Sequence, residues 1–226
     1  MGKATNLQIP VIETLYDIPS LDSSSLPAEY SFLRDKKYLV FIGKINGLKG
    51  GVVIANAIYT ILNDNKDLHF VFAGRDAGCK NLIIENAKEH SKRLIFLDRL
   101  HKQDLFRVTI NSTGVVLPSL MDNLPNACIE AMSLKKIVIG TDGASFEQLI
   151  EDGVNGFLIK LGDSGSLVNK INQLLNLSTE ERNIMQEKAY KRIELLSPER
   201  VVKKTIDFYN TANNNTQNDK EINTFK

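Results

Sequence analysis

Short apolar runs alternate with longer amphipathic segments from residue 37 to residue 159, and this alternation restricts the possible fold more than any other feature. The runs are rich in Val, Ile, Leu and Phe and are too short for helices. The segments between them have apolar residues at helical spacing and lengths of about ten residues, which suits crossovers between parallel strands. We therefore predict an α/β fold, a doubly wound and Rossmann-like parallel sheet covered by helices on both faces.

The expected elements follow from these patterns. After residue 159 the chain becomes helical and charged, and Ser178 with Glu181 three residues later has the pattern of a capping box. Ser197 followed by Pro198 marks the start of the last helix. The expected strands cover 38–43, 68–74, 93–97, 114–119 and 136–140, and the expected helices cover 51–63, 80–90, 102–111, 126–134, 164–176, 178–196 and 197–210.

Composition divides the chain into four parts. Residues 1–35 include a stretch rich in serine and proline, and we expect them to form a linker or arm. Residues 36–196 form the expected Rossmann-like domain, and residues 197–212 form a terminal helix. The polar residues 213–226 are expected to be a disordered tail.

Charge, cysteine content and hydropathy exclude several classes of protein. The 28 basic and 27 acidic residues nearly balance, so nothing indicates a nucleic-acid partner. Cys79 and Cys128 lie far apart without the spacing of a metal site, which fits a reducing compartment. No apolar run approaches the roughly 18 residues that span a bilayer, and residues 1–10 lack the apolar core of a signal peptide. We therefore expect a cytoplasmic protein with no membrane segment of its own.

The first candidate site segment follows the first expected strand. Ligands of doubly wound sheets bind beyond the carboxyl ends of the strands, so the residues directly after each strand are the candidates. Gly43, Lys44 and Lys49 occupy such positions. The glycine spacing around them matches neither the Walker phosphate loop nor the dinucleotide fingerprint, so the two lysines need another explanation.

The second candidate segment, residues 118–132, follows the fourth expected strand. Pro125 stands at the expected first position of a helix, so the amides of Asn126 and Ala127 are free to donate to an anion. Glu130 lies four residues after Asn126 and therefore shares its face of the helix. This arrangement indicates a site for an anionic ligand.

Three segments together resemble the group 1 glycosyltransferases of family 4, which have the two-domain GT-B fold. GKINGLKG (43–50) is similar to their Gly-Arg-Leu-x-x-x-Lys-Gly loop. LPSLMDNLPNACIEAM (117–132) is similar to their Pro-Ser-x-x-Glu-Gly-x-Pro-Asn-x-x-x-Glu-Ala-Met segment, and GTDGASFEQLIEDGVNGFLI (140–159) to the stretch that follows it. The segments occur in the order and at the spacing of the family, across about residues 37–160.

The resemblance implies the donor-binding domain of a retaining, metal-independent glycosyltransferase that uses a UDP-sugar or GDP-sugar and no cofactor. Lys44 and Lys49 would neutralise the donor pyrophosphate. Glu130 would accept hydrogen bonds from the ribose, and Asp122, at Asp-x7-Glu spacing, would hold hydroxyls of the donor sugar. The implied catalytic residues are Lys44, Lys49, Asp122 and Glu130, and the implied donor-binding residues are Gly43, Lys44, Lys49, Asn123, Leu124, Asn126, Ala127, Glu130 and Glu147.

The chain departs from the family mainly in length, because family members also have an N-terminal domain that binds the acceptor. The expected partner is therefore an N-terminal GT-B domain, in the same or a separate chain, through which the protein would be cytoplasmic or membrane-associated. Residues 197–212 resemble the terminal helix that crosses back toward that domain. We expect this chain to be inactive alone and to act in polysaccharide or glycoconjugate biosynthesis. The alternative is a non-catalytic nucleotide-sugar-binding or scaffolding subunit of a split glycosyltransferase, and a GT-B-like epimerase ranks last.

Overall fold

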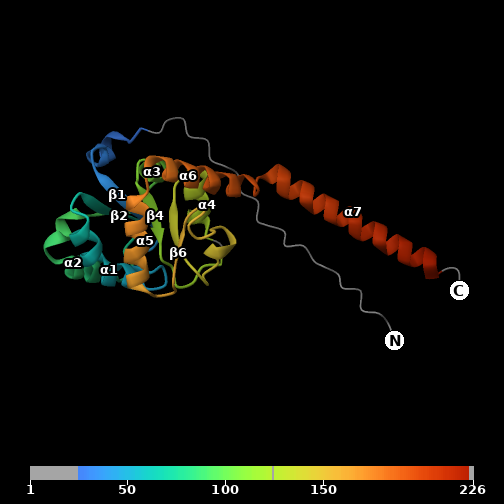
Figure 1. Ribbon diagram of the computed structural model, residues 1–226, viewed down its shortest axis with the longest axis horizontal. Coiled ribbons are helices and arrows are strands. Elements are labelled where there is room, and N and C mark those ends of the chain that lie inside the picture. The colour runs from blue at the N-terminus through green and yellow to red at the C-terminus, as the bar shows by residue number, and fades with distance from the viewer. Residues whose placement is uncertain (1–24, 124, 224–226) are drawn as a thin grey trace. The chain divides into compact units, whose positions relative to one another are not determined.

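The computed structural model describes residues 25–123 and 125–223, with side chains described up to residue 210. Within these residues, six parallel strands form one sheet in the order β3-β2-β1-β4-β5-β6 (Figure 1). This order reverses between β1 and β4, as it does in doubly wound folds. The strands are β1 (Lys37–Ile42), β2 (Leu68–Ala73), β3 (Leu94–Leu97), β4 (Gly114–Leu117), β5 (Val138–Thr141) and β6 (Phe157–Ile159).

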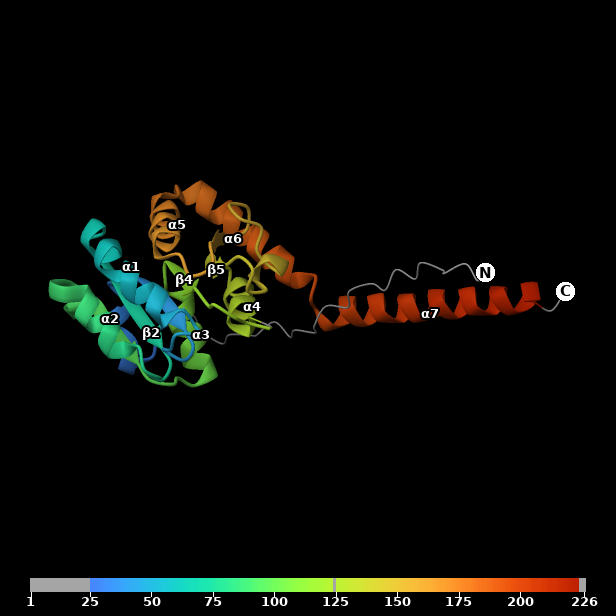
Figure 2. The ribbon, with the colours of Figure 1, turned by 90° about the horizontal axis from the view of Figure 1, so that it is seen from below.

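Helices cover both faces of the sheet. The helices α1, α2 and α5 pack together on one face, and Figure 2 shows α3 and α4 on the opposite side. The helices of the sheet domain are α1 (Gly51–Asp64), α2 (Lys80–Ala87), α3 (Lys102–Ile110), α4 (Asn126–Ser133), α5 (Ser164–Asn176) and α6 (Thr179–Glu194), with single 3-10 turns η1 (Ala28–Leu33), η2 (Lys88–Arg93) and η3 (Phe146–Gln148).

The two-residue period of the strands explains why both faces need helices. In β1, Leu39 and Phe41 join the core formed with α1, α2 and α5. Tyr38 is also fully buried, and its hydroxyl donates a hydrogen bond to the carbonyl oxygen of Val108 in α3 at 2.6 Å. Burial raises the pKa of the Tyr38 phenol. Successive strand residues thus meet different helical layers, as expected for a parallel sheet inside an α/β domain.

The predicted fold class is confirmed, and the expected strands and helices up to residue 196 occur within a few residues of their predicted bounds, whereas β6 was not among the expected strands. The capping box is also present, since the backbone N–H of Ser178 donates to Glu181 Oε2 at 2.8 Å and the N–H of Glu181 donates to Ser178 Oγ at 3.2 Å. One local prediction is wrong, because α4 begins at Asn126 and Pro125 is its N-cap rather than its first residue. No helix within the described residues has the length and apolar character needed to cross a membrane.

The structure describes parts of the expected arm and tail. Residues 1–24 lie outside the described residues, and in the rest of the expected arm Tyr30 and Leu33 of η1 are buried. At the other end, α7 (Pro198–Asn223) continues through most of the tail that we expected to be disordered. Residues 199–223 contain neither glycine nor proline, so no helix breaker interrupts the backbone hydrogen bonds.

A close contact joins the loop after β1 to the loop after β4. Gly50 has φ of +82°, and a Cβ atom at this position would lie 2.0 Å from the carbonyl oxygen of Pro118. Nearby, the backbone N–H of Leu120 donates to the carbonyl oxygen of Leu48 at 2.8 Å. Only glycine allows both this backbone conformation and this approach, so Gly50 fixes the distance between the two loops.

We expect Gly50→Ala to lower the free energy of unfolding by about 2–4 kcal/mol, because the left-handed conformation and the clash with Pro118 add. Chemical denaturation measures this change. Gly47→Ala is the matched control, since Gly47 lies in the same loop and a Cβ there meets no atom within 4 Å. Equal effects of the two substitutions would show that the contact with Pro118 does not constrain the loops.

A half-buried lysine makes stability depend on pH. The Nζ of Lys136 donates to the carbonyl oxygen of Ser112 at 2.9 Å. Burial, with a smaller effect from the charge of Arg182, lowers the pKa of Lys136 from 10.5 to about 8. The unfolded chain therefore binds this proton more tightly than the folded chain does. The resulting cost to stability is complete below pH 8 and disappears as the pH rises to 10.5.

We expect the stability of the wild type, measured relative to Lys136→Met, to rise by at most about 3 kcal/mol between pH 8 and pH 10.5. Urea unfolding at several pH values checks this difference. Lys66→Met is the control, because Lys66 is an exposed lysine and the same substitution there removes a lysine from the surface. A flat difference for Lys136→Met would mean that its ammonium group keeps its ordinary affinity for protons.

Candidate functional site

The candidate site lies at the carboxyl ends of β1 and β4, where the strand order reverses. Loops that follow these two neighbouring strands lead to helices on opposite faces, which leaves a crevice between them. Two adjoining cavities occupy this region, and Ile42 and Gly43 line both. We call them the Asp122 cavity, of about 220 Å³, and the Glu130 cavity, of about 560 Å³.

The Asp122 cavity is formed by the loop after β1 and the start of α4. Lys49 and Asp122 face each other in it, and the Nζ of Lys49 donates to Asp122 Oδ2 at 2.6 Å. The side chain of Lys49 is 37% exposed and that of Asp122 is 16% exposed. Asn126 and Ala127, the first two residues of α4, also line the cavity. Amides in the first turn of a helix have no partner within it, so this end of the cavity can hold an anion.

Backbone contacts hold both partners of this ion pair in place. The backbone N–H of Lys49 donates to Asn46 Oδ1 at 2.9 Å. Ser145 Oγ donates to the backbone carbonyl oxygen of Asp122 at 2.8 Å. The two main chains are therefore fixed, and only the side chains of Lys49 and Asp122 are free to change partners.

The Glu130 cavity is strongly basic. Glu130, in the middle of α4, lies 3.5 Å from the Nζ of Lys102 at the start of α3. The Glu130 side chain is 21% exposed, whereas Lys102 is 65% exposed. Four basic side chains and this one carboxylate line the cavity, the basic ones being Lys44, Arg75, Arg99 and Lys102. Such an excess of positive charge attracts an anionic ligand and leaves one acceptor group for its hydroxyls.

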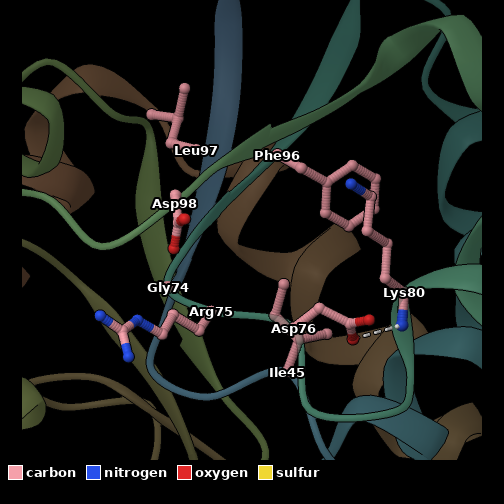
Figure 3. Close-up of a pocket in the computed structure, with 8 residues that line it drawn as sticks. All are labelled: Ile45, Gly74, Arg75, Asp76, Lys80, Phe96, Leu97 and Asp98. Carbon is pink, nitrogen blue, oxygen red and sulfur yellow. Dashed lines mark hydrogen bonds between the residues drawn. The ribbon is translucent and has the colours of Figure 1, made fainter.

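A third cavity, of about 360 Å³, lies beyond the ends of β2 and β3 (Figure 3). Its Asp76 Oδ1 accepts hydrogen bonds from the amides of Lys80, Gly78 and Cys79, and these bonds lower the pKa of Asp76. The ammonium of Lys80 lies 5.0 Å from the centre of the Phe96 ring. Figure 3 shows Arg75 pointing away from Lys80 and Phe96, and Arg75 also lines the Glu130 cavity.

The structure brings most of the predicted site residues together. Gly43, Lys49, Asp122, Asn126 and Ala127 line the Asp122 cavity, and Gly43, Lys44 and Glu130 line the Glu130 cavity.

The remaining predicted site residues are not brought into these two cavities. Asn123 and Glu147 are exposed and line neither one. Leu124 lies outside the described residues. Among the described residues, no three His, Cys, Asp or Glu side chains gather as they would around a metal ion.

Sequence reasoning missed Arg75, Arg99 and Lys102. Arg75 follows β2 after one glycine, and Arg99 follows β3 after one aspartate. The rule that places ligands beyond the carboxyl ends of strands, applied to these two strands as well, would have found both arginines. Lys102 gave no such signal, because it lies inside a helix and reaches Glu130 only through the packing of α3 beside α4.

Comparisons with known proteins agree with this geometry. The family described as glycosyl transferases group 1 matches residues 23–192. EpsD of Bacillus subtilis (strain 168), named as a glycosyltransferase, is 25% identical over 207 residues, which are 87% of this chain and 51% of EpsD. This chain thus spans about half the length of that relative.

Two solved structures share the fold. The C-terminal domain of a group 1 family glycosyl transferase, LpcC of Francisella tularensis, has a TM-score of 0.65 and 21% identity, covering 75% of this chain and 93% of that one. HepE of Anabaena, solved in complex with UDP and glucose, has a TM-score of 0.68 and 17% identity, covering 81% of this chain and 50% of HepE.

We expect inorganic pyrophosphate to raise the Tm of the chain by binding in the basic Glu130 cavity, and Arg75→Ala to weaken this binding by roughly three- to tenfold. Thermal unfolding at increasing pyrophosphate concentration measures the affinity, which should fall as salt is added. Arg34→Ala is the control, since Arg34 is exposed and precedes β1 at the opposite end of the sheet. Identical pyrophosphate affinities for the two variants would show that Arg75 does not contribute to the binding site.

Proposed function

The chain belongs to the group 1 glycosyl transferases, and we propose that it is the donor-binding, C-terminal domain of a retaining, metal-independent enzyme of this family. The proposed donor is a nucleoside diphosphate sugar. The observation that carries the proposal is the meeting of Lys44, Lys49 and Glu130 in two adjoining cavities at the switch point of the sheet. These residues come from two segments far apart in the sequence, and their charges suit the two ends of such a donor.

The proposed chemistry depends on the lysines. During transfer, the bond between the anomeric carbon of the sugar and the diphosphate oxygen breaks, and its electron pair stays on the leaving nucleoside diphosphate. The hydroxyl oxygen of the acceptor bonds to the anomeric carbon and gives up its proton. Lys44 and Lys49 would stabilise this developing negative charge, with help from the amides at the start of α4. A single positioned donor of this kind typically contributes about 3–4 kcal/mol to transition-state stabilisation.

The carboxylates would position the neutral parts of the donor. Glu130 is mostly buried, and the Nζ of Lys102 lies 3.5 Å from its Oε1, which leaves acceptor capacity on the carboxylate for ribose hydroxyls. Asp122 lies in the adjoining cavity and would face the sugar. We propose UDP or GDP as the carrier, and the UDP complex of the related HepE fold supports the first of these.

The proposed partner is an N-terminal GT-B domain that supplies the acceptor site and the other wall of the cleft. The matched length supports this, because the chain covers 51% of EpsD. Because this chain supplies only one wall of the proposed cleft, we expect no turnover by it alone. We also expect nucleotide dissociation constants of roughly sub-millimolar to millimolar, which correspond to binding free energies of about 4–5 kcal/mol. Once joined to that domain, the enzyme should give a product with the anomeric configuration of the donor.

We expect the chain to bind one of UDP, GDP and ADP selectively, and Glu130→Ala to weaken that binding roughly tenfold, because the ribose hydroxyls lose a charged acceptor. Calorimetric or NMR titration measures the three affinities. Glu187→Ala is the matched control, since Glu187 also pairs with a lysine, Lys135, but lies outside both cavities. Binding that Glu130→Ala leaves unchanged would count against the proposed site, and a folded chain that binds none of the three would favour a scaffolding role.

A further inference from the structure

The ion pair between Lys49 and Asp122 occupies the lysine that the proposed function assigns to phosphate. Its Nζ to Oδ2 distance of 2.6 Å is that of a short charge-assisted hydrogen bond. The pair joins the loop after β1 to the loop after β4, across 73 positions of sequence. Asp122 is the less exposed partner, at 16%, so its carboxylate depends on Lys49 more than Lys49 depends on it.

We infer that Asp122 competes with the diphosphate of the donor for Lys49, so that this ion pair must open or be shared before the diphosphate binds tightly. This inference rests on the proposed function, and it assigns Asp122 a role as internal competitor in addition to its expected role toward the sugar. Without the donor, the Asp122 carboxylate pairs with Lys49. It is released when Lys49 turns to the diphosphate.

Fixed main chains confine this exchange to the two side chains. The bond from the Lys49 amide to Asn46 and the bond from Ser145 to the Asp122 carbonyl both stay intact when the side chains separate. Asp122 therefore remains in the cavity after it loses Lys49, and its negative charge repels a diphosphate held a few ångströms away. The hydroxyls of a bound sugar are replacement donors for this carboxylate, whereas a nucleoside diphosphate without a sugar brings none.

The ion pair of Lys102 and Glu130, in the neighbouring cavity, is weaker than the pair of Lys49 and Asp122. Lys102 lies 3.5 Å from Glu130, and its side chain is 65% exposed, so water screens this pair more than it screens the pair of Lys49 and Asp122. Competition for a cation is thus specific to Asp122. It also favours release of the nucleoside diphosphate after transfer, because the ion pair re-forms as the diphosphate leaves.

The test measures the affinity of the full chain for UDP, GDP and ADP in the wild type, Asp122→Asn, Lys49→Ala and the double variant. We expect Asp122→Asn to tighten binding of the preferred diphosphate by roughly three- to tenfold, because Lys49 becomes available and a repelling charge is removed. Lys49→Ala should weaken binding. In the Lys49→Ala background the gain from Asp122→Asn should shrink, because no lysine is left to release.

Asp152→Asn is the matched control, since Asp152 holds Lys170 at 2.7 Å outside both cavities and should leave the affinity unchanged. Circular dichroism and Tm values establish that each variant is folded. If the wild type binds a diphosphate and Lys49→Ala weakens it, while Asp122→Asn has no effect or weakens it, the competition is refuted and the proposed function stands. If neither the wild type nor Asp122→Asn binds any of the three diphosphates, the competition and the proposed function are both refuted.

Discussion

The contact between the loop after β1 and the loop after β4 is the constraint on which the candidate site depends. β1 and β4 are paired as far as Phe41 and Val116, but the loops beyond them lead to helices on opposite faces and need a contact of their own to stay together. Gly50 lies against the Pro118 carbonyl, and the bond from the Leu120 amide to the Leu48 carbonyl ties the two backbones. Residues on either side of this contact, Lys49 and Asp122, are consequently within hydrogen-bonding distance.

Charge balance in the site follows from that contact. The Glu130 cavity has a surplus of basic groups, whereas in the Asp122 cavity the carboxylate of Asp122 neutralises Lys49. A ligand with a diphosphate and several hydroxyls satisfies both arrangements, because it supplies negative charge to the lysines and donors to the carboxylates. Binding is then an exchange of partners among charged groups, which favours ligands that carry both kinds of group over ligands that carry one.

Sequence reasoning succeeded where the physical signal is local. The strand β2 and the helix α3 were predicted almost to the residue, because apolar runs and helical spacing are properties of neighbouring positions. It failed at the start of α4, where Pro125 is the N-cap and Asn126 is the first helical residue. The same sequence is compatible with Pro125 as the N-cap or as the first helical residue. The role expected of Glu147 stays a prediction, and this side chain is exposed in η3 and lines neither cavity.

The sequence by itself determined the α/β class, the order of the helices and of every strand except β6, and the segments that follow β1 and β4, because periodicity and glycine, proline and lysine positions are written directly in it. Only the tertiary structure decided which charged groups meet. Arg75, Arg99 and Lys102 line one cavity with Glu130, and Asp122 pairs with Lys49, because parallel strands bring their carboxyl ends to one edge whatever their separation in the chain. The arrangement of loops at that edge of the sheet determines which charged residues form ion pairs, and no local sequence pattern predicts those pairs.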